Sequence, residues 1–344
     1  SKQGGDNEKL IFKILKRGDK LNLETASGEN DLVDSGLRYD LTLPLSRYYA
    51  NNAANLPSPF KALQMGSVWR ADRPQKGRFR QFVQCDIDIL GDPTSLAEIE
   101  LILATTAALS KICPDNAFTV RINDREILKG MALYCGFPED SMDQVFITLD
   151  KMDKIGLEGV EKELLESGYQ KECVDKYLDM LKNVTRNADG VRALGQKLAD
   201  VMPLEVSRNL AHIMDTVTEV SEADFGLEFD PTLVRGMSYY TGTIFEVSME
   251  GFGGSVAGGG RYDKMIGKFT GMETPACGFS IGFERIVTIL MDNGFKVPGA
   301  GEKKAYLFEK GVDSITLAGV IKEAMEERKK GIARNARRPV AQDM

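Results

Sequence analysis

Residues 68–91 read VWRADRPQKGRFRQFVQCDIDILG, and this stretch decides the fold and the chemistry that we expect. Strand-like runs at residues 62–70 and 80–90 flank a short polar loop. Residues 70–80 carry five basic residues against one acid, Asp72: Arg70, Arg73, Lys76, Arg78 and Arg80. Many basic loops are only solvated surface, but strands at both ends would hold this one rigid, and a guanidinium group binds phosphate oxygens in a bidentate manner. The pattern predicts a hairpin that binds a polyphosphate.

The second strand of this hairpin is polar on one side only. Gln84, Asp86 and Asp88 occupy alternate positions, so their side chains point to the same face of a sheet. The intervening residues are apolar: Val83, Cys85, Ile87 and Ile89. The polar face is therefore either exposed to solvent or holds a cationic or hydrogen-bonding substrate beside the phosphate-binding loop.

Composition indicates an ordinary globular protein of two or three domains, with 344 residues, 42% of them apolar and 28% charged. A net charge of −7 argues against non-specific coating of nucleic acid. No apolar run approaches the roughly 20 residues that span a bilayer, so we expect a cytoplasmic protein without a membrane partner. The five cysteines form no CxxC pair and His212 is the only histidine, which predicts no protein-held metal site and no histidine base.

The order of patterns along the chain predicts four parts. Strands, hairpins and a helix at 44–54 precede the hairpin, and a helix follows it, with Ser95 and Glu98 as a predicted capping box. Helical periodicity dominates from Pro138 to Val220, after which Gly-rich strand patterns return. We therefore expect a strand-rich core in two pieces, a helical insertion domain, and a partial C-terminal α/β unit with one strand and one helix: residues 1–137 and 221–298, 138–220, and 299–344.

At this point the residues carry a family resemblance. The hairpin resembles motif 2 of class II aminoacyl-tRNA synthetases, and in detail that of the histidyl-tRNA synthetase family. Residues 233–247, LVRGMSYYTGTIFEV, resemble the first histidine-specific signature, although Ser238 stands where an acid is more usual. Residues 258–267, GGGRYDKMIG, resemble the second signature, and residues 275–286, PACGFSIGFERI, resemble motif 3. Four segments in the family's order make chance similarity very improbable.

The resemblance implies an α+β fold, a six-stranded antiparallel sheet flanked by helices, and a homodimer. ATP, with Mg²⁺, would bind bent across the sheet. Arg70 would hold the α-phosphate, Arg78 would assist at the β- and γ-phosphates, Phe82 would stack on the base, and Arg285 would hold the γ-phosphate and the adenine face. Arg235 would reach the α-phosphate from the side opposite Arg70. Arg70 and Arg235 would thus be the catalytic residues of adenylate formation.

The resemblance also implies a histidine site. Asp40, Thr42 and Gln84 would bind the α-amino and carboxyl groups of histidine. The imidazole ring would be surrounded by polar side chains that can bond both of its nitrogens: Asp88, Tyr239, Tyr240 and Tyr262. Histidyl-adenylate would then pass its histidyl group to tRNA(His).

Other interpretations remain at this point. Motif 1, which builds the dimer interface, is not found in the chain, and the anticodon-binding pattern is not recognisable in the last forty or so residues. A histidine-binding regulatory paralogue that acts on ATP phosphoribosyltransferase would share these motifs without forming adenylate. A non-catalytic RNA-sensing module would be expected to lack the ATP arginines. Residues 138–220 resemble the family's domain that clamps the tRNA acceptor stem, or they are simply a solvated helical bundle.

Overall fold

The computed structural model describes residues 9–75, 77–234, 240–297, 304–329 and 334–337. The chain separates into two compact units, residues 1–290 and 291–344, which are described individually. The five cysteines are all free thiols. Among the described residues, no helix is both long enough and apolar enough to cross a bilayer.

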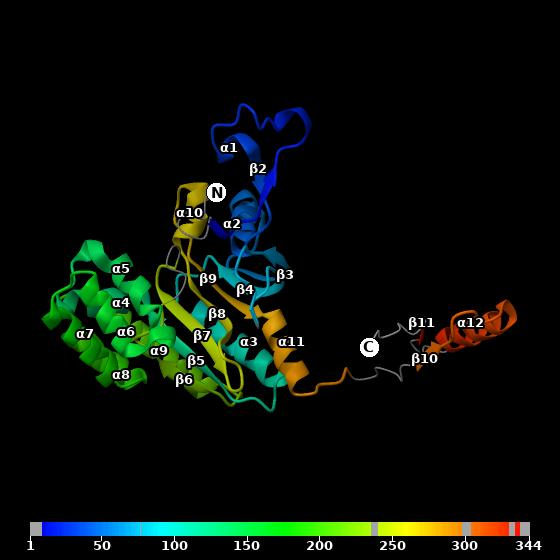
Figure 1. The fold of residues 1–344 in the computed structure, drawn as a ribbon. Coiled ribbons are helices and arrows are strands. Elements are labelled where there is room, and N and C mark those ends of the chain that lie inside the picture. Colours follow the sequence, from blue (N-terminus) through cyan, green and yellow to red (C-terminus); the bar gives the residue numbers. More distant parts are fainter. Residues whose placement is uncertain (1–8, 76, 235–239, 298–303, 330–333, 338–344) are drawn as a thin grey trace. The chain divides into compact units, whose positions relative to one another are not determined.

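A mixed sheet forms the centre of the first unit (Figure 1). In the described residues it has seven strands in the order β3-β4-β9-β8-β7-β5-β6, and every neighbouring pair is antiparallel except β5 and β6. The strands are β3 (Phe60–Trp69), β4 (Gln81–Leu90), β5 (Phe118–Asp124), β6 (Gly226–Phe229), β7 (Thr243–Met249), β8 (Ser255–Arg261) and β9 (Ala276–Gly282).

The six antiparallel strands that the resemblance implied are therefore present, and β6 is a seventh strand, paired in parallel, inside the region where the strand patterns return. The chain between β5 and β6 runs through a long series of helices. A parallel pair requires a long crossover connection of this kind, because a tight turn can join only antiparallel neighbours. β6 closes the edge of the sheet beside β5 after that excursion.

Shorter elements surround the sheet. β1 (Lys13–Leu15) and β2 (Val33–Gly36) form a separate antiparallel pair at the start of the chain. The flanking helices are η2 (Gly18–Lys20), α1 (Glu29–Leu32), α2 (Thr42–Asn52), η3 (Ala53–Asn55), α3 (Leu96–Ile112), α10 (Lys264–Thr270) and α11 (Phe283–Asp292). α3 packs on β9, and α10 packs on α2.

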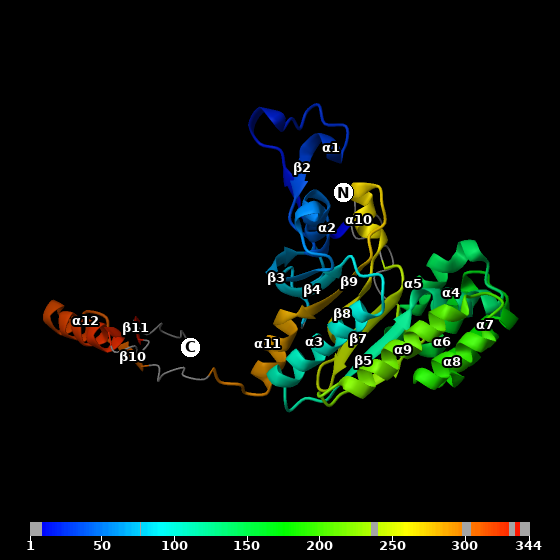
Figure 2. The same cartoon turned by 180° about the vertical axis from the view of Figure 1, so that it is seen from behind.

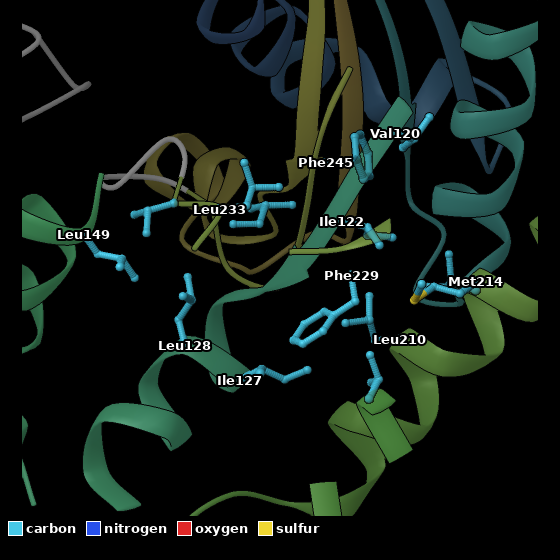
Figure 3. Close-up of a cluster of buried hydrophobic side chains, with 14 of the residues drawn as sticks. Val120, Ile122, Ile127, Leu128, Leu149, Leu210, Met214, Phe229, Leu233 and Phe245 are labelled. Carbon is cyan, nitrogen blue, oxygen red and sulfur yellow. The ribbon is translucent and has the colours of Figure 1, made fainter. Parts of the chain in front are cut away.

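Residues 125–220 form helices only, and Figure 2 shows them gathered beside β5 and β6. They are α4 (Arg125–Cys135), η4 (Glu139–Ser141), α5 (Met142–Leu149), α6 (Met152–Glu166), α7 (Lys171–Asn183), α8 (Ala188–Lys197) and α9 (Leu204–Val220). Figure 3 shows Ile122 of β5, Phe229 beside it, and Leu210 and Met214 of α9 gathered in one buried cluster. This shared apolar core anchors the helical segment to the sheet, because burial of apolar surface is the main stabilising contribution to a fold.

The second unit contains β10 (Lys304–Leu307), α12 (Ser314–Lys329) and β11 (Arg334–Arg337). β10 and β11 are parallel, with α12 as the crossover between them. We expected one strand and one helix in this unit, whereas the structure has two strands and one helix, so the expectation is wrong. β11 lies in a basic stretch of sequence. It lacks the alternation of apolar and polar residues by which a half-buried strand is identified.

The predicted capping box at the start of α3 is wrong. The side chain of Ser95 forms no capping hydrogen bond, and Glu98 instead binds Arg261, the arginine that ends β8. Nε and Nη2 of Arg261 donate to the two carboxylate oxygens of Glu98 at 2.6 Å each, and Nη1 and Nη2 also donate to the carbonyl oxygens of Asp92 and Thr94. Glu98 is only 1% exposed, so this bidentate pair anchors α3 to the sheet from inside.

Removing one member of this pair should leave an uncompensated buried charge. We expect Arg261→Met to lower the free energy of unfolding by about 3–5 kcal/mol, and the double variant Arg261→Met/Glu98→Met to recover most of that loss. Urea unfolding of the three proteins measures both effects. Lys129→Met, which removes the exposed ion pair with Glu139, is the control and should move the transition far less. A double variant as unstable as Arg261→Met would contradict the explanation.

Candidate functional site

A cavity of about 410 Å³ lies over the part of the sheet formed by β4, β8 and β9. Side chains from the loop after β3, from the start of α2 and from the first turn of α11 complete its wall. Ten residues that the sequence assigns to the site line this one cavity: Asp40, Thr42, Arg70, Arg78, Phe82, Gln84, Asp88, Tyr240, Tyr262 and Arg285. The other two assigned residues, Arg235 and Tyr239, lie outside the described residues.

The polar face of β4 forms the floor of the cavity. Gln84, Asp86 and Asp88 are each less than a tenth exposed, whereas Cys85 and Ile87 on the opposite face are half-buried. The interpretation of a solvent-exposed polar face is therefore wrong, because the polar side of β4 is buried. Removing three polar groups from bulk water costs free energy unless other hydrogen-bond partners replace the water.

Small residues on β9 leave room above these side chains. The register places Gly282 opposite Gln84, Ser280 opposite Asp86 and Gly278 opposite Asp88. A methyl group at Gly278 would lie 2.1 Å from Oδ1 of Asp88. Only glycine permits this close approach, so the pairing of β4 with β9 creates both the depth of the cavity and the position of Asp88.

Asp88 is held at the inner end of the cavity by the tyrosine that directly follows β8. The hydroxyl of Tyr262 donates to Oδ1 of Asp88 at 2.6 Å, and Oδ2 is buried without a hydrogen-bond partner among the described residues. Burial is the main cause that raises the pKa of Asp88 to about 7, against the opposing hydrogen bond from Tyr262. The free oxygen is an acceptor ready for a donor from a ligand.

Asp86 lies in the middle of the floor and is not among the site residues that the family resemblance implies. It is 3% exposed, and its Oδ1 has no partner in the described part of the chain. Burial raises its pKa to about 6, the nearby Ser280 hydroxyl lowers it, and the negative charge of Asp40 raises it further. Its neighbour Gln84 donates from Nε2 to the Ser280 hydroxyl at 3.2 Å, and Oε1 of Gln84 is also buried without a partner. The alternation on β4 was the signal that could have included Asp86.

Arg70 lies at the other end of the cavity, between two aromatic rings. Its Cζ is 4.4 Å from the centre of the Tyr39 ring and 5.0 Å from the centre of the Phe82 ring. Nε donates to the carbonyl oxygen of Tyr39 at 3.2 Å. Aromatic faces attract a guanidinium group without neutralising it, so Arg70 is oriented and keeps its charge for an anion.

The loop after Arg70 is held against α11 and the β7–β8 turn. Arg285 of α11 donates from Nε to the carbonyl oxygen of Gly77 at 3.3 Å, and from Nη1 to the hydroxyl of Ser255 at 3.1 Å. Gly77 has a φ of +72°, and a methyl group there would lie 2.7 Å from the Phe252 ring. Arg78 lies on the same loop, 4.0 Å from Asp72. The loop and α11 thus present Arg78 and Arg285 to one end of the cavity.

The start of α2 supplies the remaining wall. Asp40 is buried, and its Oδ1 accepts the backbone N–H of Leu43 at 3.2 Å in the first turn of the helix. Thr42 is the first residue of that helix. Further cavity residues not assigned from the sequence are Tyr39, Asp72, Asp86, Ser255, Ser280 and Glu284. The described residues contain no group of three His, Cys, Asp or Glu side chains that is suited to hold a metal ion, and His212 lies exposed on α9.

The raised pKa of Asp88 predicts how stability depends on pH without ligand. A carboxyl group with a folded-state pKa near 7 and an ordinary value of 3.8 stabilises the fold at low pH, and this contribution is lost as the pH rises toward 7. The stability of Asp88→Asn relative to the native chain should therefore improve by about 1–3 kcal/mol between pH 5 and pH 8. Urea unfolding at the two values measures it, with the exposed Asp115→Asn as control. Parallel behaviour of both variants would refute the role of burial.

The site can now be compared with known proteins. A family model described as histidyl-tRNA synthetase matches residues 29–286. The histidine–tRNA ligase of Leifsonia xyli subsp. xyli is 46% identical over 307 residues, which cover 83% of this chain and 68% of that protein. A probable histidine–tRNA ligase of Tropheryma whipplei (strain Twist) is 41% identical over 320 residues, which cover 90% of this chain and 73% of that protein.

Solved structures give the same likeness. A histidyl-tRNA synthetase from Nostoc sp. PCC 7120 superposes with a TM-score of 0.67 at 26% identity, covering 92% of this chain and 73% of that chain. A Bacillus halodurans C structure described as an ATP phosphoribosyltransferase regulatory subunit/histidyl-tRNA synthetase has a TM-score of 0.65. It covers 99% of this chain and 80% of that chain at 22% identity, so this likeness concerns the fold alone. The predicted α+β fold class is confirmed.

Proposed function

The chain belongs to the histidyl-tRNA synthetase family, and we propose that the cavity over β4, β8 and β9 is where it carries out the family's reaction. The protein is an aminoacyl-tRNA synthetase that activates histidine and charges tRNA. One observation supports this location: ten residues assigned from five separate sequence segments line a single cavity.

ATP occupies the end of the cavity that carries the arginines. Arg70 binds the α-phosphate, Arg78 the β- and γ-phosphates, and Arg285 the γ-phosphate and the adenine face, with Phe82 against the base. The contacts of Arg70 and Arg285 include carbonyl oxygens, a hydroxyl and aromatic rings. They hold both guanidinium groups at the cavity, where the bidentate geometry of arginine suits phosphate oxygens.

Histidine occupies the end that carries the carboxylates. Oδ2 of Asp88 accepts an N–H of the imidazole ring, while the Tyr262 hydroxyl holds the other oxygen of the same carboxylate. Tyr240 and Tyr239 complete the ring site, and Asp40, Thr42 and Gln84 bind the amino and carboxyl groups. An apolar side chain of similar size would leave the buried Asp88 unpaired, which is the kind of penalty that gives strong discrimination.

This placement defines the chemical step. A carboxylate oxygen of histidine attacks the α-phosphorus in line and forms a new P–O bond, while the bond to the bridging oxygen breaks and pyrophosphate leaves with the electron pair. Arg70 and Arg235 neutralise the charge that grows on the α-phosphate oxygens, so stabilisation is electrostatic and requires no protein nucleophile. A terminal ribose hydroxyl of tRNA(His) then attacks the carbonyl carbon of histidyl-adenylate, and AMP leaves.

Mg²⁺ fits this site as a companion of ATP. Proteins usually hold Mg²⁺ through one or two carboxylates together with substrate phosphates. Asp72 and Glu284 are the carboxylates that line the arginine end of the cavity, although Glu284 also accepts the backbone N–H of Val83 at 2.8 Å. These two residues would hold the ion, which would offset the charge of the leaving pyrophosphate.

The wider organisation follows the family. We infer a cytoplasmic homodimer that binds tRNA(His), with residues 1–137 and 221–298 as catalytic core. Residues 138–220 are inferred to be an insertion domain, and residues 299–344 to be a partial C-terminal domain of the anticodon-binding kind. α9 shares an apolar core with β5 and β6. This core supports a fixed attachment of the helical segment to the sheet.

Histidine-dependent exchange of pyrophosphate into ATP tests the proposal. The native chain should show exchange that requires histidine, and Arg70→Ala should lower its rate by about 10²–10³-fold, because it removes one group that stabilises the transition state. Arg80→Ala is a matched control from the same loop, since Arg80 is exposed and donates to the carbonyl oxygen of Asp72. Charging of tRNA(His) is measured in parallel.

The outcomes separate the alternatives. Histidine binding without exchange would overturn the synthetase assignment of this cavity and favour the regulatory paralogue. Loss of exchange with Arg80→Ala to the same extent as with Arg70→Ala would refute the specific role of Arg70. Binding of tRNA without histidine binding would favour the RNA-sensing module.

A further inference from the structure

A cluster of charged side chains lies where the helical segment meets the sheet, outside the substrate cavity. Arg121 of β5 is its centre: Nη1 donates to Oδ2 of Asp230 at 3.2 Å, and Nη2 donates to the carboxylate of Glu246 on β7. The carboxylate of Asp153, at the start of α6, lies 3.7 Å from Nη2. None of these four described side chains lines the substrate cavity. The cluster therefore belongs to neither end of the proposed active site.

Asp230 uses its other oxygen to build the turn that follows β6. Oδ1 accepts the backbone N–H of Thr232 at 2.9 Å and the Thr232 hydroxyl at 2.7 Å, and the backbone N–H of Leu233 donates to the carbonyl oxygen of Asp230 at 3.1 Å. Arg186 lies 3.9 Å from Oδ1. Asp230 is 1% exposed, so its carboxylate needs the pairing with Arg121 to replace the water that would otherwise solvate it.

The same turn is attached to β5 by the two residues that follow Arg121. The backbone N–H of Asp230 donates to the carbonyl oxygen of Ile122 at 2.9 Å, and Nδ2 of Asn123 donates to the carbonyl oxygen of Leu233 at 3.3 Å. Leu233 is 4% exposed and belongs to the buried cluster of Figure 3. Residues 230–233 are therefore fixed relative to β5, and the pairing of Arg121 with Asp230 is one of the contacts that fix them.

The turn leads directly into the first histidine signature, residues 233–247. Arg235, which the resemblance places at the α-phosphate, is two residues beyond Leu233 in the sequence. Two residues of chain span at most about 7 Å, so the turn limits where the following residues can reach. Stabilisation of a transition state depends on preorganised geometry, and a misplacement of about 1 Å can cost about 10²-fold in rate. A contact that fixes the turn can thus act on the chemical step from outside the cavity.

We propose that Arg121 is a positioning residue for adenylate formation. By pairing with Asp230 it fixes the turn at residues 230–233, and through this turn it sets the place from which Arg235 acts. The inference rests on the proposed function of the cavity. It differs from a purely structural role in one respect, because the effect of Arg121 on the rate requires the guanidinium group of Arg235.

A double-mutant cycle on histidine-dependent pyrophosphate exchange tests this requirement. Arg121→Met should lower kcat by about 10–100-fold and change the KM values for histidine and ATP by less than about threefold, because it misplaces a group that acts in the transition state. In the Arg235→Ala background, Arg121→Met should lower the residual rate by less than about twofold, since the group that it misplaces is gone. Arg192→Met removes another ion-paired arginine and is the matched control, with a rate within about twofold of the native rate.

Two milder variants probe the turn without leaving Asp230 unpaired. Arg121→Lys keeps the positive charge but loses the fork that reaches two carboxylates, so its kcat should lie between those of Arg121→Met and the native chain. Thr232→Val removes the hydroxyl that donates to Asp230 and should lower kcat alone, by a smaller factor than Arg121→Met. Thermal unfolding of every variant shows the temperatures at which all are folded, and the rates are compared there.

The outcomes separate the inference from the proposed function. If Arg121→Met and Thr232→Val cost the same factor with and without the Arg235 guanidinium group, Arg121 acts through the fold in general, and the inference is wrong while the proposed function stands. If Arg235→Ala leaves exchange at the native rate while Arg70→Ala lowers it, the inference falls together with the role of Arg235. A native chain without histidine-dependent exchange would overturn the proposed function itself.

Discussion

The register between β4 and β9 is the constraint on which the site depends. It places Gly278 opposite Asp88 and Ser280 opposite Asp86, so that small residues face the three polar side chains of β4. A shift of one residue would turn every side chain of β4 to the other face of the sheet. Asp86 and Asp88 would then point into the region of Cys277 and Phe279, which belong to the apolar core. The core and the cavity are therefore specified by the same set of backbone hydrogen bonds.

Buried charges of two kinds occur in this protein. Some are paired within the fold, as Arg261 with Glu98 inside the anchor of α3, and as Arg121 with Asp230 and Glu246 on the far strands. Where they face the cavity, an oxygen of Asp86 and one of Asp88 lack a protein partner in the described residues, and burial raises both pKa values. Since an unpaired buried charge opposes folding, its retention indicates a function that needs it.

The parts that the sequence predicted are those with a strong local signal. The alternation of Gln84, Asp86 and Asp88 defined the polar face of β4, and the four motif segments together with residues 37–44 supplied ten residues that meet in one cavity. The parts that it missed depend on distant contacts. Glu98 has the spacing of a capping box but binds Arg261, which is 163 residues away. β6 pairs in parallel only after a long helical crossover, and β11 has no alternation. Asp86 was visible in the pattern, but its missing partner was visible only in the fold.

The two ends of the cavity carry opposite charges, with arginines at one end and carboxylates at the other. At the arginine end, Arg70 and Arg285 are oriented by carbonyl oxygens, by the Ser255 hydroxyl and by the rings of Tyr39 and Phe82. At the carboxylate end, Asp88 is oriented by the neutral hydroxyl of Tyr262. A neutral partner fixes the geometry of a charged side chain without adding an opposite charge. Because β4 runs through both ends, the strand that carries the acids also sets their distance from the arginines. A ligand that bridges them must be cationic at one end and anionic at the other, which describes an amino acid bound beside a polyphosphate.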